Sequence, residues 1–289
     1  MQIKLLGQNT SHRGPGKVYQ NLSKGLSLCG HEVNKPIIGD PELTVCLQFV
    51  SDITYLDSSK TLFGPNIVTL PSDYKELYSD PKKHFLVPSQ WAKDLYCQFD
   101  FVTPDSIHVW SVGIDTDLWK PVENKEPTQD CFIYFKNRSD GDLKLIRLFL
   151  NKLGLSYSVL EYGKYTEQEL RDTCNKSKFA MLLTGTESQG IAYMEILSMG
   201  IPCYVFNQPK WKHDSSDITC PATSVPYFSK SCGTFSDNTI YLDHLSHFVA
   251  SIEQLDPRSY IVENHSLEKS AVKLLAIANE YTNVSIPLI

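Results

Sequence analysis

The sequence predicts an α/β protein with two doubly wound domains, each built around a parallel β-sheet. Three observations predict this class. Short apolar segments alternate with helical segments, as they do in βαβ units. The alternation stops near the middle of the chain, at a stretch rich in proline and charge, and then begins again. Finally, 289 residues are enough for two domains of ordinary size, each with its own core.

The first half of the chain opens with a strand and a helix. Residues 3–6 are mostly apolar and are followed by a polar, glycine-rich segment. Val18, Leu22 and Leu26 then recur every four residues, which predicts one apolar face of a helix. Gly30 begins a turn toward another extended segment. The further strands expected in this half are residues 43–49, 66–70, 84–87 and 106–110.

The domain boundary is predicted within residues 120–127, which hold two prolines and four charged side chains. Such a composition is typical of an exposed linker. We therefore expect an N-terminal domain of residues 1–122 and a C-terminal domain of residues 123–289. The last helix, residues 266–283, is long enough to pack back on the N-terminal domain.

The second half repeats the alternation of strands and helices. Two such parallel sheets leave a natural place for a nucleotide at the carboxyl ends of their strands. The expected strands are residues 131–135, 156–161, 179–184 and 202–206, and the expected helices between and after them are residues 142–153, 166–176 and 190–199.

Composition and charge exclude several classes of protein. Apolar residues make up 42% of the chain and charged residues 21%, as in soluble globular proteins. The net charge is −6, and the lysines and arginines are scattered, so no nucleic-acid partner is expected. The N-terminus has no export signal and no run of 18 residues is apolar, which predicts a cytoplasmic protein without a membrane span. The eight cysteines form no C-x-x-C pair and are expected to be reduced thiols.

The sharpest motif lies between the expected strand 179–184 and the helix that follows it. Glu187 and Glu195 are separated by seven residues, with Gly190 at the expected start of the helix. The backbone N–H groups of Gly190 and Ile191 would face a ligand bound at the helix start. A helix N-terminus favours negative charge, so a diphosphate could bind there without a metal. Glu195 could then bind ribose hydroxyls and Glu187 could reach a sugar, although acidic residues are also common at helix starts as solvated charges.

This motif resembles the E-x7-E signature of the retaining GT-B glycosyltransferases of the glycosyltransferase 4 family. That signature has the form E-G-F-G-x-x-x-x-E, followed by A-x-G-x-P. Ser188 and Gln189 replace the usual Gly-Phe, whereas Glu187, Gly190, Glu195, Gly200 and Pro202 fit the pattern. Further segments resemble the family in the family's order, namely residues 14–19 with 30–33, 85–91 and 111–121.

The resemblance implies a GT-B fold, in which two Rossmann-like domains face each other across a cleft. The C-terminal domain would bind the nucleotide-sugar donor and the N-terminal domain the acceptor. It also implies roles for individual residues. Glu187 would contact the donor sugar and Glu195 the ribose. Lys136, with Arg138 as a second cation, stands near the position of the family's arginine and would meet the donor phosphates. The remaining donor-binding candidates are Gly163, Tyr165, Gln189, Gly190 and Ile191, and a first loop of Gly14, Pro15 and Gly16 would face the cleft.

The implied activity is transfer of a sugar from a UDP- or GDP-sugar to a glycan or another hydroxyl acceptor, with retention, as in glycan biosynthesis. Glu187 and Lys136 would be the catalytic residues, and no metal or other cofactor would be required. Two alternatives remain open. The chain could be a non-catalytic nucleotide-sugar- or glycan-binding protein on the same fold, or a metal-dependent transferase that uses Asp115 and Asp117 as a D-x-D motif. Two aromatic residues are lesser candidates, His12 for the site and Trp211 for stacking on an acceptor.

Overall fold

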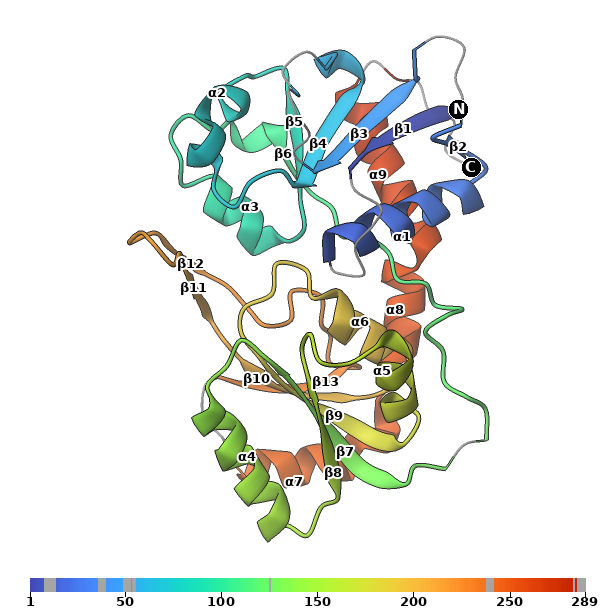
Figure 1. Ribbon diagram of the computed structural model, residues 1–289, viewed down its shortest axis with the longest axis vertical. Coiled ribbons are helices and arrows are strands. Elements are labelled where there is room, and N and C mark those ends of the chain that lie inside the picture. Colours follow the sequence, from blue (N-terminus) through green and yellow to red (C-terminus); the bar gives the residue numbers. More distant parts are fainter. Residues whose placement is uncertain are drawn as a thin grey trace. The chain divides into compact units, whose positions relative to one another are not determined.

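The computed structural model describes residues 1–7, 14–35, 40–48, 53, 56–124, 126–237, 242–282 and 284. The chain divides into two compact units (Figure 1). The first unit comprises Met1–Gly113 and Asn264–Ile289, and the second comprises Ile114–Glu263. This division lies before the predicted boundary at residue 122, and the C-terminal helix belongs to the first unit.

The sheet of the first unit is parallel throughout its described pairings. Its strands are buried runs of aliphatic and aromatic residues, as expected where helices cover a parallel sheet. The strand order is β2 (Glu32–Val33), β1 (Gln2–Leu6), β3 (Leu43–Gln48), β4 (Thr61–Asn66), β5 (His84–Val87) and β6 (Ile107–Val109).

Two long helices of the first unit, α1 (Gly14–Leu28) and α9 (Leu267–Tyr281), pack against each other. The stripe predicted on α1 is buried. Gly25 makes the close approach possible, because a Cβ there would lie 2.6 Å from the backbone oxygen of Leu267. The indole of Trp110 donates to the backbone oxygen of Ser270 at 3.0 Å and so ties α9 to the end of β6. Shorter helices are α2 (Lys75–Tyr78) and α3 (Gln90–Tyr96).

The strand predicted at residues 66–70 is wrong, because β4 occupies Thr61–Asn66. The reason is the Gly64-Pro65 pair inside β4, which in sequence normally marks a turn. In the structure Gly64 has a φ of +109°, and a Cβ there would lie 2.3 Å from the backbone oxygen of Leu86. A glycine that admits a neighbouring strand so closely is a known use of this residue inside sheets.

The second unit is also built on a parallel sheet, with strand order β13 (Gly233–Asp237), β10 (Cys203–Asn207), β9 (Ser177–Thr184), β7 (Gln129–Lys136) and β8 (Tyr157–Glu161). One face packs on α5 (Glu167–Cys174), α6 (Ile191–Ser198) and α8 (Pro257–His265). The other face packs on α4 (Asp140–Lys152) and α7 (Leu242–Ser251). The predicted fold class, two doubly wound parallel sheets, is therefore confirmed.

A small antiparallel hairpin interrupts this pattern in the second unit. It joins β11 (Lys210–Lys212) to β12 (Thr219–Pro221) and lies between β10 and β13 in the chain (Figure 1). The sequence pattern does not predict it.

Among the described residues, no helix combines the length and the hydropathy needed to span a bilayer.

Candidate functional site

Two predicted catalytic residues meet at the carboxyl end of the second sheet. Lys136 is the last residue of β7, and its Nζ lies 2.7 Å from Oε1 and 2.9 Å from Oε2 of Glu187. The ends of β7 and β9 are held together, since the amide of Gly185, the residue after β9, donates to the Lys136 backbone oxygen at 2.9 Å. The amide of Glu187 donates to the backbone oxygen of Thr223 at 3.0 Å. Backbone contacts thus fix the positions from which this ion pair forms.

The ion pair is largely removed from water. The Lys136 and Glu187 side chains are 18% and 12% exposed. Burial raises the pKa of the Glu187 carboxyl above its ordinary value, and the Lys136 charge partly opposes this rise. On its other side the Lys136 ammonium lies 4.4 Å from the centre of the Tyr162 ring, within the range of a cation–π interaction. A carboxyl with a raised pKa beside a specific charge partner is characteristic of functional sites.

Gly190 opens helix α6 in a conformation that a side chain would strain. Its φ is +79° and its ψ +54°, in the left-handed region. A Cβ at Gly190 would lie 2.2 Å from the ring of Tyr193. That ring is held in place, because the Tyr227 amide donates to the Tyr193 hydroxyl at 2.9 Å. The first amides of α6, beginning at Ile191, are the groups that a helix leaves without intrahelical partners.

Glu195 lies one turn further along α6 than Ile191 and is 2% exposed. It is close to Tyr165, whose pKa burial raises to about 12, with the Glu195 charge acting in the same direction. The Tyr165 hydroxyl donates to that of Tyr134 at 3.2 Å. Gly163, with a φ of +82°, forms the turn that brings Tyr165 back after β8. Helix α6 and this turn therefore meet around a buried carboxylate.

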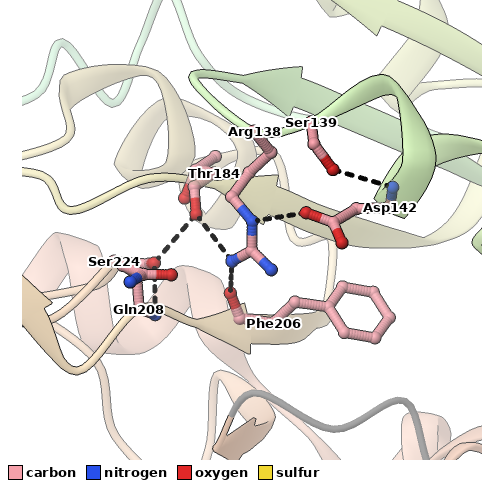
Figure 2. Close-up of polar contacts among 7 residues, drawn as sticks. All are labelled: Arg138, Ser139, Asp142, Thr184, Phe206, Gln208 and Ser224. Carbon is pink, nitrogen blue, oxygen red and sulfur yellow. Dashed lines mark hydrogen bonds and ion pairs between the residues drawn. The ribbon is translucent and has the colours of Figure 1, made fainter.

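Arg138 lies across the ends of two strands (Figure 2). Its Nη1 donates to the backbone oxygens of Thr184, at 3.4 Å, and Phe206, at 3.2 Å. Its Nε donates to Asp142 at 3.2 Å, and the side chain is 14% exposed. Ser224 also donates to the Thr184 oxygen, at 3.2 Å. The guanidinium thus ties β9 to β10, a placement that the predicted role as a second phosphate-binding cation does not anticipate.

The other predicted residues lie as follows. Gln189 is buried, and its amide group donates to the sulfur of Met194 at 3.9 Å. Gly14, Pro15 and Gly16 form the first turn of α1 instead of a loop before it, which suits proline because the first helical turn needs no amide donor there. These three residues belong to the first unit, whereas the other candidate site residues described here belong to the second. His12 lies outside the described residues.

Several residues around the site make contacts that the sequence does not predict. Tyr162 stands directly after β8, in the segment 162–165 that resembles the loop with which the family holds the base, but its contact with Lys136 was not predicted. Thr223 and Ser224 lie in a segment whose sequence favours a packed loop over a site. Asp115, the first aspartate of the D-x-D pattern, is buried and accepts from the amide of Leu118 at 3.2 Å, so it closes a local turn.

The arrangement of two such sheets matches solved glycosyltransferases of the GT-B class over nearly the whole chain. The fold is GT-B. A glycosyltransferase from Rickettsia africae ESF-5 aligns with a TM-score of 0.62 and 11% identity, covering 98% of this chain and 99% of that one. AviGT4, a glycosyltransferase involved in avilamycin A biosynthesis, aligns with a TM-score of 0.61 and 12% identity, covering 96% and 97%. Anabaena HepE, in complex with UDP and glucose, aligns with a TM-score of 0.57 and 10% identity, covering 97% and 100%.

Comparison by sequence gives no such match. No family model matches the chain, and no curated protein does. The likeness to the GT-B structures therefore establishes the fold, while the chemistry has to be argued from the residues of this chain.

Proposed function

We propose that this chain is a retaining glycosyltransferase, similar to the glycosyltransferase 4 family, that moves a sugar from a UDP- or GDP-sugar to a hydroxyl acceptor without a metal. The observation that carries the proposal is the ion pair of Lys136 and Glu187 at the carboxyl end of the second sheet. This is the edge at which open α/β sheets bind ligands. Next to it, Gly190 begins a helix whose amide groups can meet an anion.

The chemistry follows from these positions. When the bond between sugar and nucleotide breaks, negative charge grows on the leaving diphosphate, and groups already aimed at that charge lower the barrier. The amides at the start of α6 and the ammonium of Lys136 supply this stabilisation. In this proposal Glu187, held by Lys136, contacts the donor sugar, and Glu195 binds the ribose. Retention then follows if the acceptor attacks on the face that the leaving group vacates and a donor phosphate oxygen takes its proton.

A panel of UDP- and GDP-sugars tests the proposal. Each donor is scored by thermal shift and by release of nucleoside diphosphate, with EDTA present. We expect one donor to stabilise the protein and to be hydrolysed slowly without an acceptor. Turnover that appears only with added Mn²⁺ would overturn the metal-free mechanism, and silence across the panel would overturn the activity.

A non-catalytic nucleotide-sugar- or glycan-binding protein is the second candidate. The observation in its favour is the altered pair at Ser188 and Gln189, where Gln189 turns into the core toward Met194. Such a protein would be stabilised by a donor or glycan yet would release no diphosphate from any donor, even over long incubation. The same panel therefore separates the two functions.

A further inference from the structure

Helix α4 carries two apolar stripes, and only one of them is packed. Leu143, Ile146 and Leu150 recur on one side of the helix and pack on the second sheet, where α4 and α7 cover the same face (Figure 1). Leu145 and Leu148 lie on a different side of the helix, and they are 42% and 57% exposed. The first stripe therefore accounts for the packing of α4, and the second stripe needs another explanation.

The second stripe belongs to a concentration of exposed apolar side chains. Ten large hydrophobic side chains of the described residues are exposed, and three of them fall within residues 145–153, at Leu145, Leu148 and Leu153. Leu145 and Leu148 are contiguous, because residues three apart are neighbours on a helix surface, and Leu153 caps the C-terminus of the helix. Single exposed leucines are ordinary, whereas a contiguous exposed group marks an interaction surface.

Exposed cations border these three leucines. Lys144 and Arg147 lie on the side of the helix next to the leucines, and Lys152 continues the leucine stripe toward the end of the helix. None of these three cations makes an ion pair in the part of the chain that the structure describes. No aspartate or glutamate occurs within residues 143–160, although the whole chain has 33 acidic residues and a net charge of −6. We call the three leucines and the three cations the outer face of α4.

The charge of the outer face decides which partner fits it. In a two-fold dimer built on this face the cations of one copy would meet those of the other, which is unfavourable. Nucleic acids are bound chiefly through their phosphates and would leave the leucines in water. An anionic bilayer satisfies both kinds of side chain, because apolar groups enter the boundary of the acyl region while cations meet the headgroups.

We propose that the outer face of α4 docks this protein on an anionic membrane surface, with its three leucines in the lipid and its three cations at the phosphate headgroups. The helix stays packed on its sheet, so the contact is peripheral and reversible. The proposal goes beyond the transfer reaction and does not rest on it. Helix α4 covers one face of the second sheet, whereas α6, which begins at the proposed phosphate site, covers the other.

Sedimentation of the full chain with sucrose-loaded vesicles tests the proposal. The probes are vesicles of phosphatidylcholine alone and vesicles of an equimolar mixture of phosphatidylcholine and phosphatidylglycerol. We expect binding to the mixed vesicles to be at least about tenfold tighter, with a difference that shrinks as the salt concentration rises. Equal binding to both kinds of vesicle, or binding to neither, overturns the proposal.

Substitution of the leucines tests the apolar part of the contact. L145Q/L148Q should weaken binding to the mixed vesicles at least about tenfold, because less apolar surface leaves water. Glutamine is a good helix former, so the helix itself is kept. V262Q/V272Q changes two exposed valines on α8 and α9 and should leave the affinity unchanged. Full retention of binding in L145Q/L148Q would overturn the role of the leucines.

Removal of the cations tests the electrostatic part. K144Q/R147Q should weaken binding to the mixed vesicles about 20-fold, since each cation near an anionic surface contributes roughly fivefold. K176Q/K230Q lowers the net charge equally through two exposed lysines elsewhere in the second unit and should have at most about a twofold effect. Equal loss in the two variants would show attraction of the chain as a whole, and it would overturn the assignment to α4.

Two measurements without lipid complete the test. The urea midpoint of each variant should equal that of the unmodified chain, because the altered side chains are exposed. If L145Q/L148Q is destabilised, K144Q/R147Q still decides the proposal, since it leaves every apolar side chain in place. Light scattering should give one molecular mass for L145Q/L148Q and the unmodified chain. An unmodified dimer that L145Q/L148Q converts to a monomer would overturn the proposal in favour of a contact between two copies.

Discussion

Glu187 of the second unit and two buried histidines of the first unit have contrasting surroundings. In the second unit, Glu187 is buried together with a counter-charge, Lys136. In the first unit, His108 and His265 are buried, and each lies beside an uncharged polar side chain. His108 Nε2 lies 3.0 Å from Nδ1 of His84, and His265 Nδ1 lies 3.4 Å from the hydroxyl of Ser111. A paired charge is available for chemistry, whereas a neutral imidazole serves packing.

Burial shifts the pKa values of the histidines and of Glu187 for the same physical reason. Removal from water disfavours the charged form of any group. It lowers the pKa of His108 to about 4, with the neighbouring His84 and Lys93 acting in the same direction and Asp105 against it. It also lowers the pKa of His265 to about 4, assisted by the charge of Lys273. For Glu187 burial raises the pKa, but the Lys136 ammonium offsets part of that rise.

Breaking the ion pair should give the largest effect. Glu187→Gln keeps the size of the side chain and removes its charge, so we expect diphosphate release to fall by at least about 100-fold, the range seen when a transition-state contact is lost. Lys136→Met should fall similarly, and the double variant little further, because the two residues act as a unit. Glu253→Gln, an exposed carboxylate of the same unit, is the control. Activity of Glu187→Gln within threefold of the unmodified chain would remove the pair from the mechanism.

The buried histidines and Glu187 should contribute with opposite signs to the pH dependence of the free energy of unfolding. A histidine whose folded-state pKa is about 4 stabilises the fold fully above pH 6.5 and loses this contribution as pH falls toward 4. The loss reaches about 3 kcal/mol for each group. The raised pKa of Glu187 acts oppositely, since its contribution is present below pH 4.5 and is lost as pH rises through the folded-state value.

The measurement is the urea midpoint of the first unit as a function of pH, together with histidine pKa values from NMR. His108→Gln should remove about half of the dependence between pH 6.5 and 4, because one of the two histidines that titrate there is gone while His265 remains. His247→Gln, an exposed histidine of α7, should leave it unchanged. The groups around His108 are His84, Lys93, Asp105 and Tyr281, so none of them should be altered in this test. An ordinary pKa for His108 would contradict the assignment.

Most strands of the two sheets could be predicted from sequence, because strands that are covered on both faces are largely apolar. Strand β13, Gly233–Asp237, was not predicted, since its sequence Gly-Thr-Phe-Ser-Asp is mostly polar. Strand β4 could not be predicted either, since Gly64 and Pro65 give a turn signal in the middle of it. The hairpin could not either, because three-residue strands with the sequence Lys-Trp-Lys carry no apolar pattern. The local sequence pattern therefore predicts elements with a continuous apolar surface. It does not predict elements whose conformation depends on a neighbouring strand, as in β4, or on side-chain hydrogen bonds, as in the hairpin.

The site shows the same limit. Lys136 and Glu187 could both be named as candidates from their positions after expected strands. Their contact could not be predicted, because 51 residues separate them in the chain. Arg138 shows the converse: a cation after a strand predicts anion binding, but sequence does not reveal that its guanidinium is directed at the carbonyl groups of Thr184 and Phe206.

Two glycines with the same backbone conformation sharpen the comparison of the units. Gly190 opens α6 with a φ of +79°, and Gly30 follows α1 with a φ of +78°. Alanine at either position meets the left-handed penalty, about 1 kcal/mol. At Gly30 a Cβ has nothing within 4 Å, whereas at Gly190 it would lie 2.2 Å from the Tyr193 ring. We therefore expect Gly30→Ala to destabilise by about 1 kcal/mol and Gly190→Ala by about 2 to 3 kcal/mol.

Urea unfolding followed for each unit measures both variants. Gly190→Ala should also lose the thermal shift given by the donor, because the strain falls on the helix start that we propose as the phosphate-binding site. Gly30→Ala should keep that shift in full. Equal destabilisation by the two variants would mean that Tyr193 moves aside easily, and that the start of α6 is less rigid than its contacts indicate.

The smallest effect belongs to the aromatic ring on Lys136. One lysine of each unit can be compared here: Lys136 lies over the Tyr162 ring at 4.4 Å and Lys83 over the Phe63 ring at 5.5 Å. Lys83 also makes an ion pair with Asp80 at 3.3 Å, so the Phe63 ring is the weaker of its two contacts. Tyr162 is 43% exposed, and at exposed sites such a contact is worth about 0.5 to 1 kcal/mol. Tyr162→Leu should therefore weaken donor binding about two- to fivefold.

Tyr162→Phe is the matched control, because it keeps the ring and removes only the hydroxyl. Donor affinity measured by calorimetry should be unchanged in this variant if the π face alone holds the ammonium. Equal weakening in the two variants would assign the effect to the hydroxyl instead. If neither variant changes affinity, Glu187 alone positions the Lys136 ammonium. The two lysines would then be held in the same way, each by its ion pair with a carboxylate, and neither aromatic ring would contribute measurably.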